Sequence, residues 1–419
     1  MRIRTKTFFL LGCSVFWLTM LAACAGFDPQ PMDRIPFMDR AQTRIKENVR
    51  VTAAVLSPGE SEAAFGVPLY TRGIQPVWLE IENRDGEALW FSHVGLDPNY
   101  FPPHEVAYRH HASFSKSRNQ RMDRHFHKLA IGSYIPPGTI RSGFVFTHLD
   151  LGTKNFNVDL IGEDHQIRAF TFFINVPGLR VDHHEVDWDS LYSKKERVSY
   201  GKINLREALG RLPCCTTDST GKREGDPLNL VIIGWTEDVY HALIRAGWNE
   251  TGTLNQTDFS MTETLSGVWR QYRYEPVNPL YLYGRPQDAA FRKNRETTHE
   301  RNELRLWLSP MSFEGKPVWV GEINRDIGLR IAGRSIAYKV EPDMDEARTY
   351  FLQTLWFAQR LEKFAYVKGV GAAPMSEPRK NIRGDAFFTD GHRLVLWVSH
   401  EPVSFSEVEF EEWEIPPMR

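Results

Sequence analysis

The feature that most constrains the fold of this 419-residue chain is its N-terminus. Three basic residues within the first six positions precede an apolar run from Phe8 to Leu21. This run has the length of the apolar region of a secretory signal peptide and is shorter than a transmembrane helix requires. We therefore expect residues 1–23 to be an export signal, with the folded part beginning after it in a compartment that permits disulfides.

The end of this segment reads Leu21-Ala22-Ala23-Cys24 and resembles the lipobox of bacterial lipoproteins. The resemblance implies cleavage before Cys24, which then becomes the lipidated, palmitate-bearing N-terminus. Ala25, rather than Asp, follows the cysteine, and in the lipoprotein pattern this resembles proteins sent to the outer membrane. The expected location is therefore the bacterial cell envelope, at the outer membrane and facing the periplasm. An uncleaved signal anchor is the alternative.

The balance of charges gives no sign of a nucleic-acid partner. The chain has 51 Lys and Arg against 53 Asp and Glu, a formal net charge of −2. Nucleic-acid-binding surfaces are usually markedly basic. We expect instead a membrane partner, through the lipid anchor at Cys24, and an anionic envelope polymer or a protein partner.

The first half of the chain reads as a tether followed by strands. Residues 24–45 contain three prolines and suit a tether. Runs rich in Val, Ile, Phe and Trp then alternate with turn formers, and these expected strands are Val49–Leu56, Pro76–Asn83, Leu89–His93, Gly143–Leu149, Phe156–Ile161 and Phe170–Val176. Many short strands without long helical windows predict an antiparallel β-sandwich over residues 46–178.

The second half, residues 185–419, alternates between strand and helix signals. Apolar residues at helical spacing predict helices over Thr236–Ala246 and Asp343–Phe364. Strand candidates lie before, between and after them. This order predicts an α+β domain with a mostly antiparallel sheet and helices packed on one face.

The most basic stretch lies inside the expected sandwich, at residues 107–128, where six Lys and Arg accompany one acid. If residues 116–128 are helical, four of these positions share one face at i, i+3, i+7 and i+10, namely Arg118, Arg121, His125 and Lys128. Such a face could meet anionic lipid phosphates or an anionic polymer. The residues we expect to bind the anion are Arg118, Arg121, Arg124 and Lys128. A solvated insertion between two strands is the alternative.

Cys214 and Cys215 are adjacent, and the sequence leaves their redox state open. The distance between neighbouring Cα atoms, about 3.8 Å, is below the usual disulfide range of about 4.4–6.8 Å. Two free thiols in a linker are therefore the simplest expectation. A strained vicinal disulfide or an intermolecular bridge is the alternative in an oxidising envelope.

Several blocks between residues 200 and 400 resemble, in order, the LssY-like C-terminal domain family. They are Asp226-Pro-Leu-Asn-Leu-Val-Ile-Ile-Gly, Leu280-Tyr-Leu-Tyr-Gly-Arg-Pro-Gln-Asp, Leu304-Arg-Leu-Trp, Pro317-Val-Trp-Val-Gly-Glu-Ile-Asn, Glu341-Pro-Asp-Met-Asp-Glu and Phe388-Thr-Asp-Gly-His-Arg-Leu. The family is bacterial, is often found beside membrane-embedded modules of the phosphatidic-acid-phosphatase or DedA type, and has no established activity. Members commonly carry a His pair before the Asp-x-Asp block, where this chain has Tyr338 and Lys339. The resemblance therefore implies a compartment and no inherited metal site.

Acids and arginines in these blocks suggest two function classes. The candidate acidic and phosphate-binding residues are Arg285, Asp288, Arg325, Asp326, Asp343, Asp345 and Asp390. No nucleophile elbow or phosphate-binding P-loop is present, which favours a non-enzymatic binding or assembly module at the membrane surface without a cofactor. The alternative is a phosphoester hydrolase in which Asp288, Asp326, Asp343 and Asp345 hold a divalent cation. Asp343 and Asp345 also suit a purely structural role at a helix start.

Overall fold

A computed structural model of the chain describes residues 27–150, 153–163, 165–175, 188–251, 277–295, 300–332 and 335–417. The chain divides into two compact units, Met1–Asp150 with Val158–Leu179 and Leu151–Asn157 with Arg180–Arg419, and each is described by itself. Cys24 and the expected export signal lie outside the described residues. Within the described ranges, no helix has the length and apolar character needed to cross a membrane.

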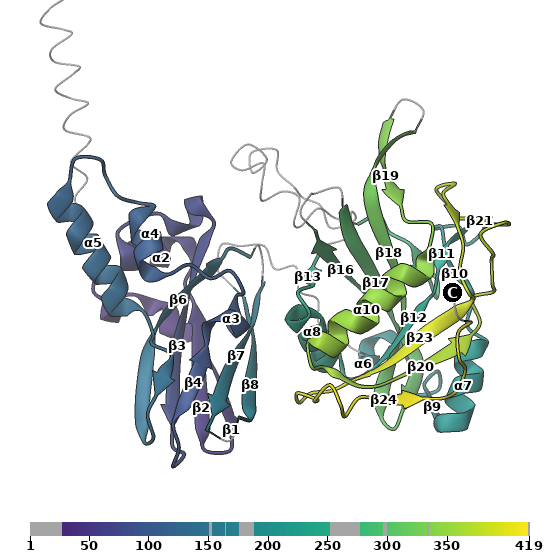
Figure 1. The fold of residues 1–419 in the computed structure, drawn as a ribbon, viewed down its shortest axis with the longest axis horizontal. Helices are drawn as coiled ribbons and strands as arrows, with labels where there is room; N and C mark the ends of the chain where they lie inside the picture. The colour runs from purple at the N-terminus through teal and green to yellow at the C-terminus, as the bar shows by residue number, and fades with distance from the viewer. Residues whose placement is uncertain are drawn as a thin grey trace, which may run out of the picture. The chain divides into compact units, whose positions relative to one another are not determined.

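Two four-stranded sheets form the first unit (Figure 1). The first sheet contains, in order, β1 (Gln42–Lys46), β2 (Val49–Val55), β3 (Ile74–Asn83) and β6 (Thr139–His148), and all its pairs are antiparallel. The second contains β5 (Tyr134–Ile135), β4 (Leu89–Ser92), β7 (Thr153–Gly162) and β8 (Ile167–Asn175). In β3, Leu79 and Ile81 are buried while Trp78 and Glu80 are half-buried, which confirms the period-two pattern expected of a strand.

Helices cover one face of the first sheet. α2 (Pro58–Phe65), α4 (Pro103–Tyr108) and α5 (Lys116–Leu129) contribute to one apolar core together with Phe144 and Phe146 of β6. The shorter helical segments of this unit are η1 (Met32–Arg34), η2 (Pro36–Arg40), η3 (Leu69–Arg72) and α3 (His93–Leu96). α2 begins with a capping box, because Ser57 and Glu60 each accept a hydrogen bond from the other's backbone N–H.

A ten-stranded mixed sheet is the centre of the second unit. Its main path is β13 (Asn249–Glu250), β16 (Ala289–Asn294), β17 (Glu300–Phe313), β18 (Lys316–Ala332), β12 (Leu230–Ile233), β23 (His392–Val398), β20 (Leu361–Lys368) and β24 (Glu409–Glu411). β19 (Ser335–Val340) pairs with β18, and β9 (Val198–Tyr200) pairs with β17. Most pairs are antiparallel, and the parallel ones are β12–β23, β20–β24 and β9–β17.

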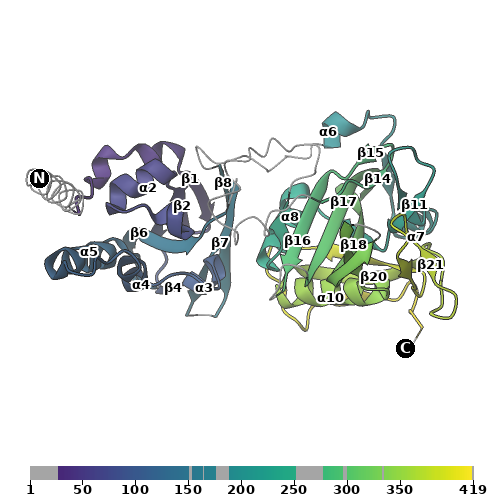
Figure 2. The ribbon, with the colours of Figure 1, turned by 90° about the horizontal axis from the view of Figure 1, so that it is seen from above.

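The two faces of this sheet have different covers. α8 (Thr236–Arg245) and α10 (Met344–Phe357) lie on one face, and α10 crosses the strands in Figure 1. The other face packs against α7 (Lys202–Gly210) and a small sheet of β11 (Glu224–Pro227), β10 (Cys215–Thr217), β14 (Tyr281–Leu282) and β15 (Arg285–Pro286). Figure 2 shows β14 and β15 on the side of the sheet opposite α10. The remaining elements are α6 (Trp188–Leu191), β21 (Arg379–Lys380) and β22 (Ala386–Phe387).

The expected α+β class is confirmed, but one element was predicted too long. The helix expected over Asp343–Phe364 ends at Phe357, and β20 begins at Leu361. Gln359 has a left-handed backbone (φ 57°), which turns the chain out of the helix, and Leu361 then pairs with Val398 of β23. Helical spacing alone does not reveal such a long-range pairing.

Candidate functional site

α5 presents a basic face to solvent. Its inner side is apolar, with Met122 and Phe126 fully buried in the core of the first unit. Arg121, Arg124 and Lys128 are exposed on the outer side. We call these three residues the α5 basic face. It is a cationic surface whose charges are available to an external anion.

Two residues expected on this face, Arg118 and His125, are only partly exposed. The His125 ring donates to the carbonyl oxygen of Ala64 at 2.8 Å and packs against Phe65, so it points into the core. Arg118 is half-buried, and its Nε is inaccessible to solvent. His125 therefore does not share the solvent-facing side with Arg121 and Lys128, and Arg118 lies at the border of that side, because positions 118 and 125 lie one turn on either side of the buried Met122.

Where the described chain begins, it contacts α5. Phe27 is almost fully buried, and its ring lies edge-on to His125 with centroids 5.6 Å apart. The same ring packs on Gly66, whose left-handed backbone (φ 64°) ends α2 and where an added Cβ would lie 3.3 Å from the Phe27 ring. The position of Phe27, three residues after Cys24, is thus fixed against α5.

Arg285 and Asp288, two of the predicted phosphate-site residues, are paired with each other. The guanidinium donates from Nε and Nη2 to the two carboxylate oxygens, each at 2.9 Å. Both side chains also bind the backbone of Leu308, through its carbonyl at 2.7 Å and its N–H at 2.7 Å. The Arg285 guanidinium further lies over the Tyr192 and Tyr283 rings. This pair fastens β15 to β17.

Asp345 and Asp390 meet around Arg348. Arg348 donates to both Asp390 oxygens, at 3.0 and 2.6 Å. Asp345 accepts from the Thr389 hydroxyl at 2.6 Å and from the Asp390 backbone N–H at 2.7 Å. Although burial opposes ionisation, hydrogen bonds from His392 and Arg348 hold the pKa of Asp390 well below its usual range. The group connects the start of α10 to the loop before β23.

The last three predicted site residues are also separate. Asp343 is the N-cap of α10 and accepts from the Asp345 N–H at 3.1 Å, the structural role considered above. Asp326 on β18 binds Arg301 at 3.0 Å. Arg325 points to the opposite face of β18, where it lies over the Tyr350 ring.

These predicted residues therefore fall into several groups, each with partners of its own. A hydrolase of the kind considered above needs Asp288, Asp326, Asp343 and Asp345 at one centre. Among the residues that the structure describes, no three of these carboxylates approach within metal-binding range of one another.

A set of buried charges lies on one face of β16, β17 and β18, and Asp326 is its one member that the sequence pattern singled out. We call it the buried ionic strip: Arg292, Arg301, Glu303, Arg305, Glu322 and Asp326, each at most 3% exposed. Glu303 binds Arg292 at 2.7 Å and Arg305 at 2.8 Å. Arg305 also binds Glu322 at 2.8 Å. The strip is a continuous chain of ion pairs across three strands.

Burial and pairing compete within this strip. Burial raises the pKa of Glu322 to about 7, despite the nearby Arg305. Burial also raises the pKa of Asp326. Glu303 behaves in the opposite way: burial opposes its ionisation, but the charges of Arg292, Arg305 and Arg301 hold its pKa well below the usual value. Glu303 is thus the fixed anion of the strip, and Glu322 titrates near neutral pH.

One sequence signal could have pointed to the strip. Arg301, Glu303 and Arg305 alternate with Leu304 and Leu306, so the three charges share one face of β17. A polar face of this kind is usually solvated. Here it is covered by residues far along the chain: the Arg305 Nε donates to the carbonyl of Asn278.

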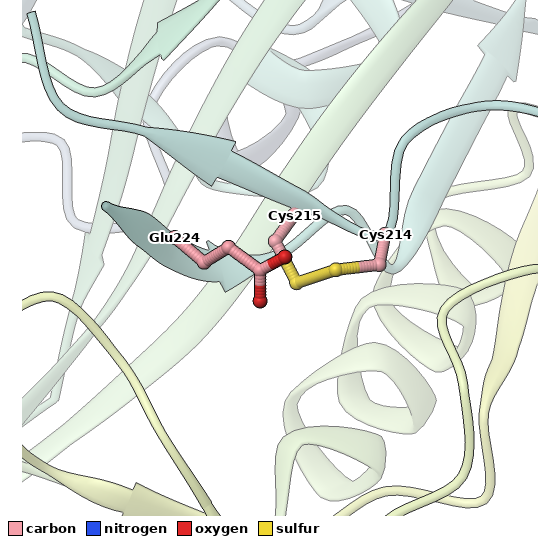
Figure 3. A group of neighbouring side chains, drawn as sticks. All are labelled: Cys214, Cys215 and Glu224. Carbon is pink, nitrogen blue, oxygen red and sulfur yellow. A yellow bond between two sulfur atoms is a disulfide. The ribbon is translucent and has the colours of Figure 1, made fainter. Parts of the chain in front are cut away.

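Cys214 and Cys215 form a vicinal disulfide (Figure 3), with Cα atoms 3.7 Å apart. Arg379 donates to both sulfurs, at 3.1 and 3.2 Å, and pairs with Glu224 at 3.0 Å. Cys215 is buried and belongs to β10. The expectation of two free thiols in a linker was therefore wrong, because the pair belongs to a strand and is bridged.

Comparison with known proteins places the second unit in a family. Residues 207–392 match the family described as LssY C-terminus. This region includes the ionic strip, the disulfide and most of the strands of the mixed sheet. No curated protein matches the chain. The resemblance read from the sequence blocks is confirmed, and the second unit carries a domain of the LssY C-terminus family.

Proposed function

We propose that this chain is a bacterial envelope lipoprotein, lipidated at Cys24, whose first unit docks on an anionic membrane surface through the α5 basic face. It acts there as a non-enzymatic binding or assembly module that holds the LssY C-terminal domain near the membrane. The observation that carries the proposal is the contact of Phe27 with α5, because it ties the anchored end of the chain to the most basic helix.

The length of chain between anchor and helix supports this docking. Two residues separate Cys24 from Phe27, so the two Cα atoms are at most about 10 Å apart. A lipid on Cys24 therefore holds α5 close to the headgroups. Arg121, Arg124 and Lys128 would then lie near the range of about 8 Å over which exposed charges act at physiological salt.

The α5 basic face would contribute to membrane binding in addition to the lipid on Cys24. The lipid on Cys24 would itself attach the chain to the membrane, and the basic face would add to this attachment. Each Lys or Arg near an anionic surface contributes about 1 kcal/mol. Phe114, just before α5, is fully exposed and Tyr108 is largely exposed, and both are aromatic side chains of the kind that lie at membrane interfaces.

The experiment is flotation of the unlipidated chain, beginning at Ala25, with vesicles of zwitterionic lipid containing one part in three of anionic lipid. The double variant Arg121→Gln/Arg124→Gln should partition about 30-fold more weakly, at about 1 kcal/mol for each charge. Arg44→Gln/Arg141→Gln, which removes two exposed arginines of the same unit, is the matched control and should bind as the unchanged chain does.

Lipidation is tested separately in cells. Radiolabelled palmitate should label the full chain and not Cys24→Ser. Equal labelling of both proteins would remove the anchor from the proposal. Equal vesicle binding by both double variants would show that the α5 basic face does not contribute to membrane binding.

A further inference from the structure

We propose that Asp238, His241 and His400 form a binding site for a divalent transition metal, with Zn²⁺ the best-suited ion. One ligand atom from each residue lies within 4.8 Å of those from the other two. The His400 Nδ1 is 2.7 Å from Asp238 Oδ1, and the two imidazole centroids are 6.0 Å apart. This site does not depend on membrane docking.

The fold brings the three ligands together from distant positions in the sequence. β12 and β23 are parallel neighbours, with Ile233 opposite Trp397, so their carboxyl ends lie at the same edge of the sheet. α8 begins three residues after β12, and His400 follows β23 by two residues. In α/β sheets the carboxyl edge of parallel strands is a common place for ligand sites.

The helix and the loop hold the ligands in defined positions. Asp238 and His241 are three residues apart in α8 and therefore project on the same side of the helix. Both are buried, at 7% and 3% exposure. The His400 backbone is fixed because the buried Arg360 donates to its carbonyl oxygen. The His400 side chain is 54% exposed, so the site opens to solvent on that side.

The surroundings favour a cation. Glu237 Oε1 lies 3.8 Å from His241 Nε2, and Glu401 Oε1 lies 4.0 Å from His400 Nε2. With Asp238, these carboxylates give the site three negative charges. Arg360 contributes one positive charge on the backbone side of His400. The two outer glutamates are exposed and could provide a fourth ligand or orient an imidazole.

The donor set identifies the class of metal. Two imidazole nitrogens and one carboxylate oxygen are typical of zinc sites that keep a fourth position for water. Magnesium and calcium prefer oxygen ligands throughout, so they suit this site poorly. A half-exposed third ligand gives the metal access from solvent.

The test is Zn²⁺ binding to the full chain, purified in detergent and stripped with chelator, measured by equilibrium dialysis against zinc chloride. We expect one ion per chain. His241→Ala and His400→Ala should each weaken binding by at least about 100-fold, since outer-shell partners alone are worth 10–100-fold. His400→Ala changes a half-exposed side chain, so it keeps the proposal testable if His241→Ala does not fold.

Two control variants locate the site. His127→Ala removes an exposed histidine of α5 and should bind zinc normally. Cys214→Ser/Cys215→Ser, examined under reducing conditions, removes the second candidate metal cluster among the described residues, and this variant should also bind zinc normally. Absence of a stoichiometric ion, zinc retained in His400→Ala, or zinc lost in the cysteine variant would each overturn the proposal.

Discussion

The α5 basic face of the first unit and the buried ionic strip of the second unit use the same residue types for opposite purposes. On α5, Arg121 and Arg124 point into solvent, where their charges can reach a partner. In the strip, Arg305 is 1% exposed and bound to Glu303 and Glu322. Burial, rather than the number of arginines, therefore decides whether the guanidinium groups are open to solvent, as on α5, or hold strands together, as in the strip.

The largest effect is expected from Arg305→Met. The substitution keeps much of the side-chain volume but leaves Glu303 and Glu322 buried without their shared cation. Breaking a buried pair in this way costs about 3–5 kcal/mol. Urea unfolding should show the loss. Arg211→Met, which removes an exposed arginine paired with Glu207, should change stability by less than about 0.5 kcal/mol. Equal losses of unfolding free energy in Arg305→Met and Arg211→Met would contradict the conclusion that burial decides the contribution of an arginine.

Glu322→Gln should change the pH dependence of stability. The folded-state pKa of Glu322 is about 7, above its value in the unfolded chain, so its stabilising contribution is complete below pH 4.5 and is lost as the pH rises through 7. Relative to the unchanged chain, the glutamine variant should gain up to about 3 kcal/mol between pH 4.5 and 8. Urea unfolding at several pH values measures this. A constant difference between the two proteins would contradict a raised pKa.

Salt should weaken the electrostatic interactions of the α5 basic face much more than those of the buried ionic strip. Raising the ionic strength from 0.1 to 1 M shortens the screening length from about 10 to about 3 Å. Vesicle binding through the α5 basic face should then fall at least about tenfold, since two or three contacts of about 1 kcal/mol each are screened. The free energy of unfolding should change by less than about 1 kcal/mol, because buried pairs are screened much less. Salt-insensitive vesicle binding would show that apolar contacts dominate.

The exposure of Arg379 lies between that of the buried strip arginines and that of the α5 arginines. Its substitution should give the smallest change in unfolding free energy. Its side chain is 30% exposed, and its partner Glu224 is 67% exposed. Exposed ion pairs contribute about 0–1 kcal/mol. Arg379→Met should therefore lower the unfolding free energy by less than about 1 kcal/mol in the same urea assay, provided the disulfide stays intact. A loss comparable to that of Arg305→Met would mean that exposure is not the deciding variable.

Local patterns predicted most strands of the first unit and the α+β class of the second, but β1 and β5 were missed. Most of β1 lies within residues 24–45, which were expected to be a tether; that expectation was wrong, because Phe27, Ile35 and Phe37 are buried in the core of the first unit. The alternation from Trp78 to Glu82 was enough to identify β3, because a strand with one wet face has a period of two. The boundary between α10 and β20 was missed, because Leu361 is a strand residue only through its pairing with Val398.

The candidate sites also depend on long-range contacts that local sequence patterns do not reveal. Charge counting found the basic stretch, but the buried Met122 and Phe126 determine which of its residues face solvent. The predicted acid cluster consists of groups brought to different partners by β15, β18 and α10. The ligands Asp238 and His400 are 162 positions apart, and only the parallel pairing of β12 with β23 brings them together.

Site-specific photo-crosslinking in the full chain, residues 1–24 included, tests most directly whether α5 docks on the membrane. A benzophenone amino acid replaces Gln120, an exposed residue of α5, or Arg44, an exposed residue of β1, and the protein is irradiated in membranes. If α5 docks on the membrane, lipid adducts should form from position 120 and few or none from position 44. Equal labelling at the two positions, or labelling from position 44 alone, would contradict this docking.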